Sequence, residues 1–564
     1  MIIRGSDSFI LSKEGVTQGD PLGMMFYAIG LLPLTRKLKM GSSFLSKLIE
    51  NSVLKDNTNW IQNWYADDSA CSADFQSILG WLKLLMSEGP KFGYFPEPEK
   101  SYLVVHADFI DEAKLIFADL KVNVVTGKRF LGGFVGGVDD TEKWILEKVQ
   151  SWVKAIKCLS KAAEFEPHLV HVSLTKSLQN EWGYIQRVVM NVERPFSLLR
   201  ETLVSSLIPS LTKLFGDQIN EIEASLIMVS SQNGGLGIRD PVSTANLAFD
   251  SSAMGTGLLS DAIKTGTTLD LEKHDHQMKV TRNLFQSKRS RLEIDQVVSN
   301  SILLPEIRQR ILHRIRGGDC STWLSMIPTH DNHFLMSADV FRDAIALRYG
   351  RTPIKMNGFC DGCSQPFDIS HALDCKMVGL VGARHNESRD LNIDMLRLTG
   401  LSQTVCKPVI KEADKSGNGG LRVDWGVRGF WEFQREALFD ICILNADAPS
   451  YSSISLETLF NSARDRKKSK YGDIAEARRA TFTPIIATCD AVFDHEAVTY
   501  FKRISTLLSN KWNQHYSQIH GWLKTRMQVC ILRSVSLCIR GSRTKFRGAG
   551  IEDGAQIAVF RCHD

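Results

Sequence analysis

The chain has 564 residues, of which 43% are hydrophobic and 23% are charged, and its formal net charge is +5. These values fit a soluble globular protein of about three or four domains, and the small net charge does not by itself require a nucleic-acid partner. No apolar run of about twenty residues occurs, the first residues lack the apolar core of a secretory signal, and twelve cysteines over this length do not make a disulfide scaffold. We therefore expect no membrane span and no secretion, but an intracellular protein with reduced thiols, nuclear or cytoplasmic.

Two adjacent aspartates, Asp67 and Asp68, follow an aromatic-rich run that ends at Tyr65. Like charges this close repel each other, and a hard divalent cation is the usual compensation. A Gln-Gly-Asp-Pro turn that includes Gln18 and Gly19 comes earlier and opens a predicted helix. An Asp-Asp pair is also common in an ordinary hairpin turn, so the pair alone does not decide between the two interpretations.

Two further motifs follow in order. Lys100 lies in a Gly-Tyr-Phe-Pro-Glu-Pro-Glu-Lys-Ser segment just before a predicted strand from Tyr102 to Val105, and Leu131 and Gly132 lie in a Phe-Leu-Gly-Gly turn. Together with the first two, these motifs resemble the later palm motifs of reverse transcriptases, particularly those of non-long-terminal-repeat retrotransposons.

The resemblance implies a role for each of these residues. Asp67 and Asp68 would bind catalytic Mg²⁺, and Lys100 would lie near the triphosphate of a deoxynucleotide. Gln18, Gly19 and Tyr65 would contact the template or the incoming nucleotide. Leu131 and Gly132 would belong to the turn that grips the primer end. There are two alternatives: Gly19 has only a structural role in its turn, and Lys100 is an ordinary solvated lysine.

The same family places another metal-binding aspartate on a strand well before the Gln-Gly motif. Asp7 is too close to Gln18 to occupy that strand. We therefore expect an N-terminally truncated protein that does not polymerise as it stands, because errors of about 1 Å in catalytic geometry cost roughly 10²-fold in rate.

The region from Thr141 to Ala346 has mainly helical periodicity, with Trp144, Val149 and Trp152 on one face. It resembles the thumb and connector of related retrotransposon proteins, although an ordinary helical core fits the pattern equally well. The Gly234-Gly235-Leu236-Gly237 segment is not followed by the lysine of a nucleotide-binding loop, and we predict a structural turn there.

A cysteine-histidine cluster with the spacing Cys360-x2-Cys363-x7-His371-x3-Cys375 follows. Four such ligands suit a closed, tetrahedral structural Zn²⁺ site, whereas free buried thiols are the alternative. A CCHC knuckle between polymerase and nuclease is typical of retrotransposons that carry a restriction-like endonuclease. As in that family, a histidine, His385, comes shortly afterwards, and we predict a structural or nucleic-acid contact for it.

Asp424 and Asp440 lie sixteen positions apart, the second within an apolar predicted strand from Leu438 to Leu444. A hairpin can bring two such carboxylates to one Mg²⁺ ion, and a lysine beside them can orient water or stabilise charge. The arrangement resembles a restriction-like endonuclease in which the lysine is displaced onto a helix, here predicted from Leu456 to Ala480. Val423 stands where that family has proline, and Cys442 where simpler relatives have lysine. The lysine candidates are Lys467, Lys468 and Lys470.

Two basic clusters lie towards the C-terminal end of the sequence. One contains Arg464, Arg466 and the three lysine candidates, and the other contains Arg533, Arg540, Arg543, Lys545 and Arg547. Basic clusters can neutralise phosphates, and the first can also act as a nuclear-import signal, but a solvated helix face is an equally good interpretation of either.

We thus expect a multidomain α+β protein. Residues 1–140 would form a partial reverse-transcriptase palm, 141–346 a helical thumb and connector, 347–400 the CCHC zinc knuckle region, and 401–564 an α/β restriction-endonuclease-like domain. The resemblance implies an RNA-directed DNA polymerase with a nuclease-like domain, acting on an RNA template and a DNA target. A catalytically dead nucleic-acid-binding remnant and a metal-dependent DNA endonuclease without polymerase activity are the alternatives.

Overall fold

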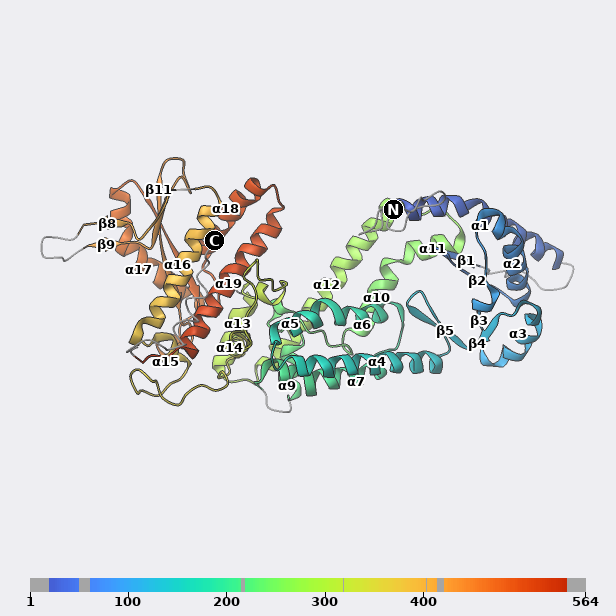
Figure 1. Cartoon of the computed structure of the whole chain (residues 1–564), viewed down its shortest axis with the longest axis horizontal. Helices are drawn as coiled ribbons and strands as arrows, with labels where there is room; N and C mark the ends of the chain where they lie inside the picture. Colours follow the sequence, from blue (N-terminus) through green and yellow to red (C-terminus); the bar gives the residue numbers. More distant parts are fainter. Residues whose placement is uncertain are drawn as a thin grey trace, which may run out of the picture. The chain divides into compact units, whose positions relative to one another are not determined.

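The computed structural model of the chain describes residues 20–49, 61–214, 219–317, 319–401, 403–412 and 420–544, with the main chain alone for 41–49. It is a mixed α+β protein, mostly helical, with small sheets (Figure 1). The chain divides into two compact units. The first is built from Met1–Lys148, Ile185–Val192 and Ala248–Leu284, and the second from Val149–Tyr184, Glu193–Leu247 and Phe285–Asp564. None of the described helices is long and apolar enough to cross a membrane.

The first unit contains three two-stranded sheets and the helices that pack beside them. Its elements are α1 (Gly23–Ile49), β1 (Ile61–Tyr65), β2 (Asp68–Ser72), α2 (Phe75–Glu88), β3 (Tyr102–Val104), α3 (Ile110–Ile116), β4 (Asn123–Val125), β5 (Gly127–Phe130), β6 (Gly133–Gly136) and α11 (Gly257–Thr265). The pairs β1–β2 and β5–β6 are antiparallel, and β3–β4 is parallel. Leu34 and Leu38 of α1 pack with Trp81 and Leu85 of α2 in the core beside β1 and β2.

The middle of the chain is mainly helical, as its periodicity predicts. Its helices are α4 (Val138–Ala162), α5 (Pro167–Ser173), α6 (Gln179–Val188), α7 (Glu193–Thr202), α8 (Ile208–Thr212), α9 (Glu221–Ile227), α10 (Ala245–Gly255), α12 (Leu271–Ser301), α13 (Glu306–Gly317) and α14 (Ala338–Arg348). The triple-glycine segment is a structural turn, as predicted: the carbonyl groups of Gly234 and Gly235 accept hydrogen bonds from the buried guanidinium of Arg348. A side chain at Gly235 would lie 2.3 Å from the Val229 carbonyl oxygen, so only glycine fits there.

The C-terminal part of the second unit is an α/β arrangement around a four-stranded sheet of order β12-β11-β10-β7. Its elements are α15 (Ile369–Asp374), α16 (Leu380–Leu398), β7 (Thr404–Cys406), β8 (Val409–Lys411), β9 (Leu421–Arg422), β10 (Trp425–Arg428), β11 (Glu436–Leu444), α17 (Leu456–Ala477), β12 (Thr481–Thr488), α18 (His495–Trp512) and α19 (Tyr516–Arg540). The predicted strand from Leu438 to Leu444 is therefore confirmed. Strand β10 is antiparallel to both neighbours, whereas β11 and β12 are parallel.

Helices cover both faces of the sheet. Successive side chains of β11 point to opposite faces, so this strand contacts helices on both sides. Phe439 and Ile441 pack against α16, α18 and α19, while Leu438 and Leu444 pack towards α17. Asp440 lies between them in the strand and therefore faces α17, the helix with the lysine candidates.

Candidate functional site

The register between β10 and β11 brings the two predicted carboxylates together. Trp425 pairs with Phe439, and their rings stack at a centroid distance of 5.5 Å. Asp424, one residue before Trp425, consequently lies opposite Asp440, and its amide donates to the Phe439 carbonyl at 3.0 Å. Both aspartates are buried, with 8% and 5% of their surface exposed.

The Asp440 carboxylate is contacted by two side chains of α17. The Lys467 ammonium donates a hydrogen bond to its Oδ2, and the hydroxyl of Tyr471, one helical turn further on, also donates to it. Burial raises the pKa of Asp440, and the nearby Asp424 raises it further, while Lys467 opposes both effects. Lys467 therefore stabilises the ionised form of the Asp440 carboxyl, whereas burial alone would favour its protonated form.

The Asp424 carboxylate is oriented from the other side. Its Oδ2 accepts a hydrogen bond from the Ile441 amide at 2.8 Å and lies 3.0 Å from Nε2 of His385 on α16. The sequence predicted a structural or nucleic-acid contact for His385 without naming its partner, and the structure puts its imidazole against Asp424. Sequence reasoning thus did not connect His385 or Tyr471 with the acid pair, because both contacts depend on how helices α16 and α17 pack against the sheet.

Among the three lysine candidates, Lys467 is the one that reaches the acids. The Lys470 ammonium lies 4.6 Å from the ring centroid of Tyr471, and Lys468 pairs with Glu496 at 2.5 Å. The thiol of Cys442 lies on the same face as Asp440; burial raises its pKa, and the proximity of Lys467 lowers it. The Lys467 ammonium, carried by α17, therefore lies near both Asp440 and Cys442 on β11.

The basic run on α17 is largely neutralised within the domain. Arg464 pairs with Asp494, Lys467 with Asp440, and Lys468 with Glu496. Three of its five charges are thus already compensated, which favours a structural role for these three over general phosphate binding.

The four predicted zinc ligands converge. The ligand atoms of Cys360, Cys363, His371 and Cys375 all lie within 4.8 Å of one another, with Cys363 Sγ 3.3 Å from His371 Nε2 and Cys360 Sγ 4.0 Å from Cys375 Sγ. Burial raises the pKa of Cys360, but the amide groups of Cys363 and Gly362 stabilise its thiolate and bring the pKa down to about 6. Three sulfur donors and one imidazole are a ligand set that Zn²⁺ prefers, so this group can hold a metal such as zinc.

The local fold explains why these ligands meet. Ser364 adopts a positive φ of 60° and its amide bonds to the Cys360 carbonyl, closing the turn that carries the first two cysteines. Asp368 caps α15 by accepting from the His371 amide at 2.7 Å. His371 lies in α15 and Cys375 directly follows its last residue, four positions further on.

The Asp67–Asp68 pair lies at the turn of the β1–β2 hairpin. Tyr65 pairs with Asp68, and both aspartates are exposed. The Tyr94 hydroxyl donates to the Asp67 carbonyl at 2.9 Å and hydrogen-bonds the Ser69 hydroxyl at 2.8 Å. Tyr94, which lies beyond the hairpin in sequence, therefore stabilises its turn. Among the described residues, no third carboxylate, histidine or cysteine completes a metal-binding group at this turn.

The remaining palm candidates lie on separate elements of the first unit. Lys100 is exposed and pairs with Glu97 at 2.6 Å. Leu131 and Gly132 form the tight turn between β5 and β6, with positive φ angles of 46° and 79°. Gln18 and Gly19 fall outside the described residues.

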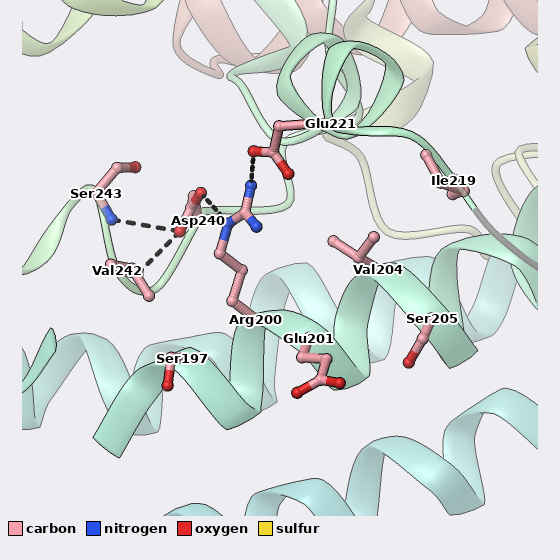
Figure 2. Close-up of a pocket in the computed structure, with 10 residues that line it drawn as sticks. All are labelled: Ser197, Arg200, Glu201, Val204, Ser205, Ile219, Glu221, Asp240, Val242 and Ser243. Atoms are coloured by element: carbon pink, nitrogen blue, oxygen red, sulfur yellow. Dashed lines mark hydrogen bonds and ion pairs between the residues drawn. The ribbon is translucent and has the colours of Figure 1, made fainter. Parts of the chain in front are cut away.

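A cavity of about 600 Å³ lies elsewhere in the second unit, beside α7. Figure 2 shows Arg200 extended between Asp240 and Glu221, to both of which it is hydrogen-bonded, while Ser197 and Glu201 point another way. The Arg200 guanidinium is already compensated by these two carboxylates, so it is not available to bind an anion in the cavity. We assign the cavity no ligand.

Comparison of the chain with known proteins supplies no further constraint: no protein-family model matches it, and neither does any curated protein.

Proposed function

We propose that this chain is a protein of a non-long-terminal-repeat retrotransposon of the restriction-like-endonuclease type, and that its C-terminal domain is a metal-dependent DNA endonuclease. The observation that carries the proposal is the contact of Lys467 with Asp440 beside the buried Asp424. Two acids at neighbouring central strands of a sheet, with a lysine beside them, are groups that metal-dependent phosphodiester hydrolysis uses.

The donor set fits a hard cation. Asp424 and Asp440 supply carboxylate oxygens, which Mg²⁺ prefers, and a cation beside them would favour the ionised form of the buried Asp440, whose pKa burial raises. Bound Mg²⁺ would act as a Lewis acid towards the phosphate and lower the pKa of water.

The surrounding residues have separate tasks in this proposal. Asp424 is held in place by the Ile441 amide and His385, and Asp440 by Tyr471. Asp424 and Asp440 would hold the cation, and the Lys467 ammonium would be placed to donate a hydrogen bond to the scissile phosphate or the attacking water. That group would stabilise the negative charge that develops during cleavage.

The polymerase part of the proposal rests on the order of the palm motifs. In the family, these residues copy an RNA template into DNA with deoxynucleotides and Mg²⁺, starting from a nicked DNA target. We propose that Asp67 and Asp68 descend from that function and that this chain alone does not polymerise. Efficient extension of a DNA primer on an RNA template by the purified chain would contradict this part without affecting the nuclease.

The nuclease is tested by nicking of supercoiled plasmid DNA in Mg²⁺. The Asp440→Asn variant keeps the shape of the side chain but removes its charge, and we expect it to lose cleavage. Asp473→Asn is the matched control, because Asp473 lies on α17 with its side chain exposed. Equal nicking by the parent chain and Asp440→Asn would reject the proposed site. Salt-sensitive DNA binding without any cleavage would instead favour the nucleic-acid-binding alternative.

A further inference from the structure

The segment that follows α19, Gly541–Thr544, packs against the turn that carries the first two metal ligands. Asp361, between Cys360 and Gly362, accepts hydrogen bonds through Oδ2 from the Ser542 hydroxyl at 2.7 Å and from the Arg543 amide at 2.8 Å. We call this segment the C-terminal clasp.

Gly362 allows the clasp to approach this closely. A Cβ atom at this position would lie 2.6 Å from both the Cβ and the carbonyl oxygen of Arg543, a separation that real Cβ atoms do not show. The ligand turn and the clasp are therefore in direct contact through their backbones, although about 180 residues separate them in the sequence.

The side chain of Arg543 reaches the other half of the ligand set. Only 1% of this residue is exposed, and its guanidinium donates to the Ala372 carbonyl at 2.9 Å, next to the ligand His371. It also lies 4.8 Å from the ring centroid of Phe367, which in turn packs edge-on against the His371 imidazole at 5.9 Å. One residue of the clasp thus touches both the CxxC turn and α15, the helix that carries His371 and is followed directly by Cys375.

The charge of Arg543 suits this position. A Zn²⁺ ion with three thiolates and a neutral imidazole carries one negative charge in excess. Within the part of the chain that the structure describes, no carboxylate pairs with the Arg543 guanidinium, and its hydrogen bonds go to the carbonyl groups of Ala372, Cys538 and Gly541. A buried cation without an acidic partner is costly, and a negatively charged metal centre nearby would offset that cost.

We propose that the C-terminal clasp is an integral part of the zinc centre, in which Asp361 and Arg543 are positioning residues that set the affinity for the metal. Asp361 fixes the CxxC turn, and Arg543 fixes α15 and balances the charge of the thiolates. Outer groups of this kind typically contribute about 10- to 100-fold to metal affinity. This inference goes beyond the proposed nuclease and does not depend on it.

The test measures the zinc affinity of the full chain by competition with a chromophoric chelator. We expect Asp361→Ala and Arg543→Gln to bind zinc about 10- to 100-fold more weakly than the parent. Arg543→Lys keeps the positive charge but not the planar donor group. Its zinc affinity should lie between that of Arg543→Gln and that of the parent. Ser542→Ala removes the hydroxyl that donates to Asp361 and also contacts Thr544 within the clasp, and it should weaken zinc binding by about 2- to 10-fold.

The control is Asp374→Ala. Asp374 is an exposed carboxylate next to the ligand Cys375 and makes no hydrogen bond or ion pair with the described residues, so its removal should leave the affinity unchanged. Ser542→Ala decides the question if Asp361→Ala fails to fold, as judged by circular dichroism. Affinities within about twofold of the parent for all folded clasp variants, an equal loss in Asp374→Ala, or a parent chain that binds no zinc would each overturn the proposal.

Discussion

The Lys467 ammonium lies against the carboxylate of Asp440, a residue of which only 5% is exposed, and so occupies the side of the acid pair at which a cation is needed. The ammonium and a metal ion therefore compete for the same carboxylate. We predict that Lys467→Met lowers the rate of DNA nicking by about 10²- to 10³-fold, the usual loss for a charge-stabilising donor, while the variant binds Mg²⁺ more tightly. Nicking rates over a Mg²⁺ titration measure both effects. Lys470→Met serves as the control, since Lys470 lies over the ring of Tyr471 rather than at Asp440.

His385 should matter for cleavage although it is distant from the acids in sequence. Its Nε2 lies 3.0 Å from Asp424 Oδ2, so His385→Ala removes a group that orients a metal-binding carboxylate. Loss of such an outer contact typically costs about 10- to 100-fold in metal affinity or activity. Kinetics that are unchanged in His385→Ala would show that the Ile441 amide is sufficient to hold Asp424. The exposed His276 offers a histidine control.

Removal of the metal from the Cys/His group should destabilise the chain. We predict that the parent binds about one equivalent of zinc per chain, that a chelator lowers its thermal midpoint, and that the Cys360→Ser/Cys363→Ser double variant binds none. Metal content by atomic emission and unfolding followed by circular dichroism measure these effects. Cys158→Ser, which alters an exposed cysteine, should behave like the parent. A parent chain that is free of zinc, and whose unfolding does not respond to added zinc, would contradict the assignment.

Two buried histidines should make the helical core sensitive to acid. Burial lowers the pKa of His168 to about 3, helped by the neighbouring His171, and burial lowers that of His171 to about 4. The unfolded chain takes up protons at these sites near the ordinary value of 6.5, before the folded chain does. Stability is therefore fully present above about pH 6.5 and falls as the pH drops towards the folded pKa values, by roughly 1.4 kcal/mol per pH unit for each histidine.

Urea unfolding at pH 7.5 and pH 5.5 checks this prediction. His168→Gln can still accept the hydrogen bond from the Met336 amide, and it should lose less stability on acidification than the parent does. The same loss in both proteins would mean that His168 does not contribute to the acid sensitivity.

Local patterns in the sequence predicted much of the fold. The apolar run from Leu438 to Leu444 is a buried strand, the basic segment from Leu456 is a helix that ends at Ala477 rather than Ala480, and the CCHC spacing brings four ligands together. Each of these features depends on residues close in the chain, for which periodicity and ligand spacing carry the information.

The rest required tertiary packing. The choice of Lys467 over Lys468 and Lys470 depends on how α17 is rotated against β11, and three lysines within four positions face different directions on a helix. The contacts of His385 with Asp424 and of Arg543 with Ala372 join segments that no short motif connects.

The central claim is that Asp424 and Asp440 form the site of a Mg²⁺-dependent nuclease. The most direct measurement follows nicking of a supercoiled plasmid by the parent chain and by the Asp424→Ala/Asp440→Ala double variant, each with Mg²⁺ and with excess chelator. The account predicts nicking by the parent in Mg²⁺ alone and none by the double variant. Nicking that persists in the double variant, or a folded parent that never nicks DNA, would contradict it.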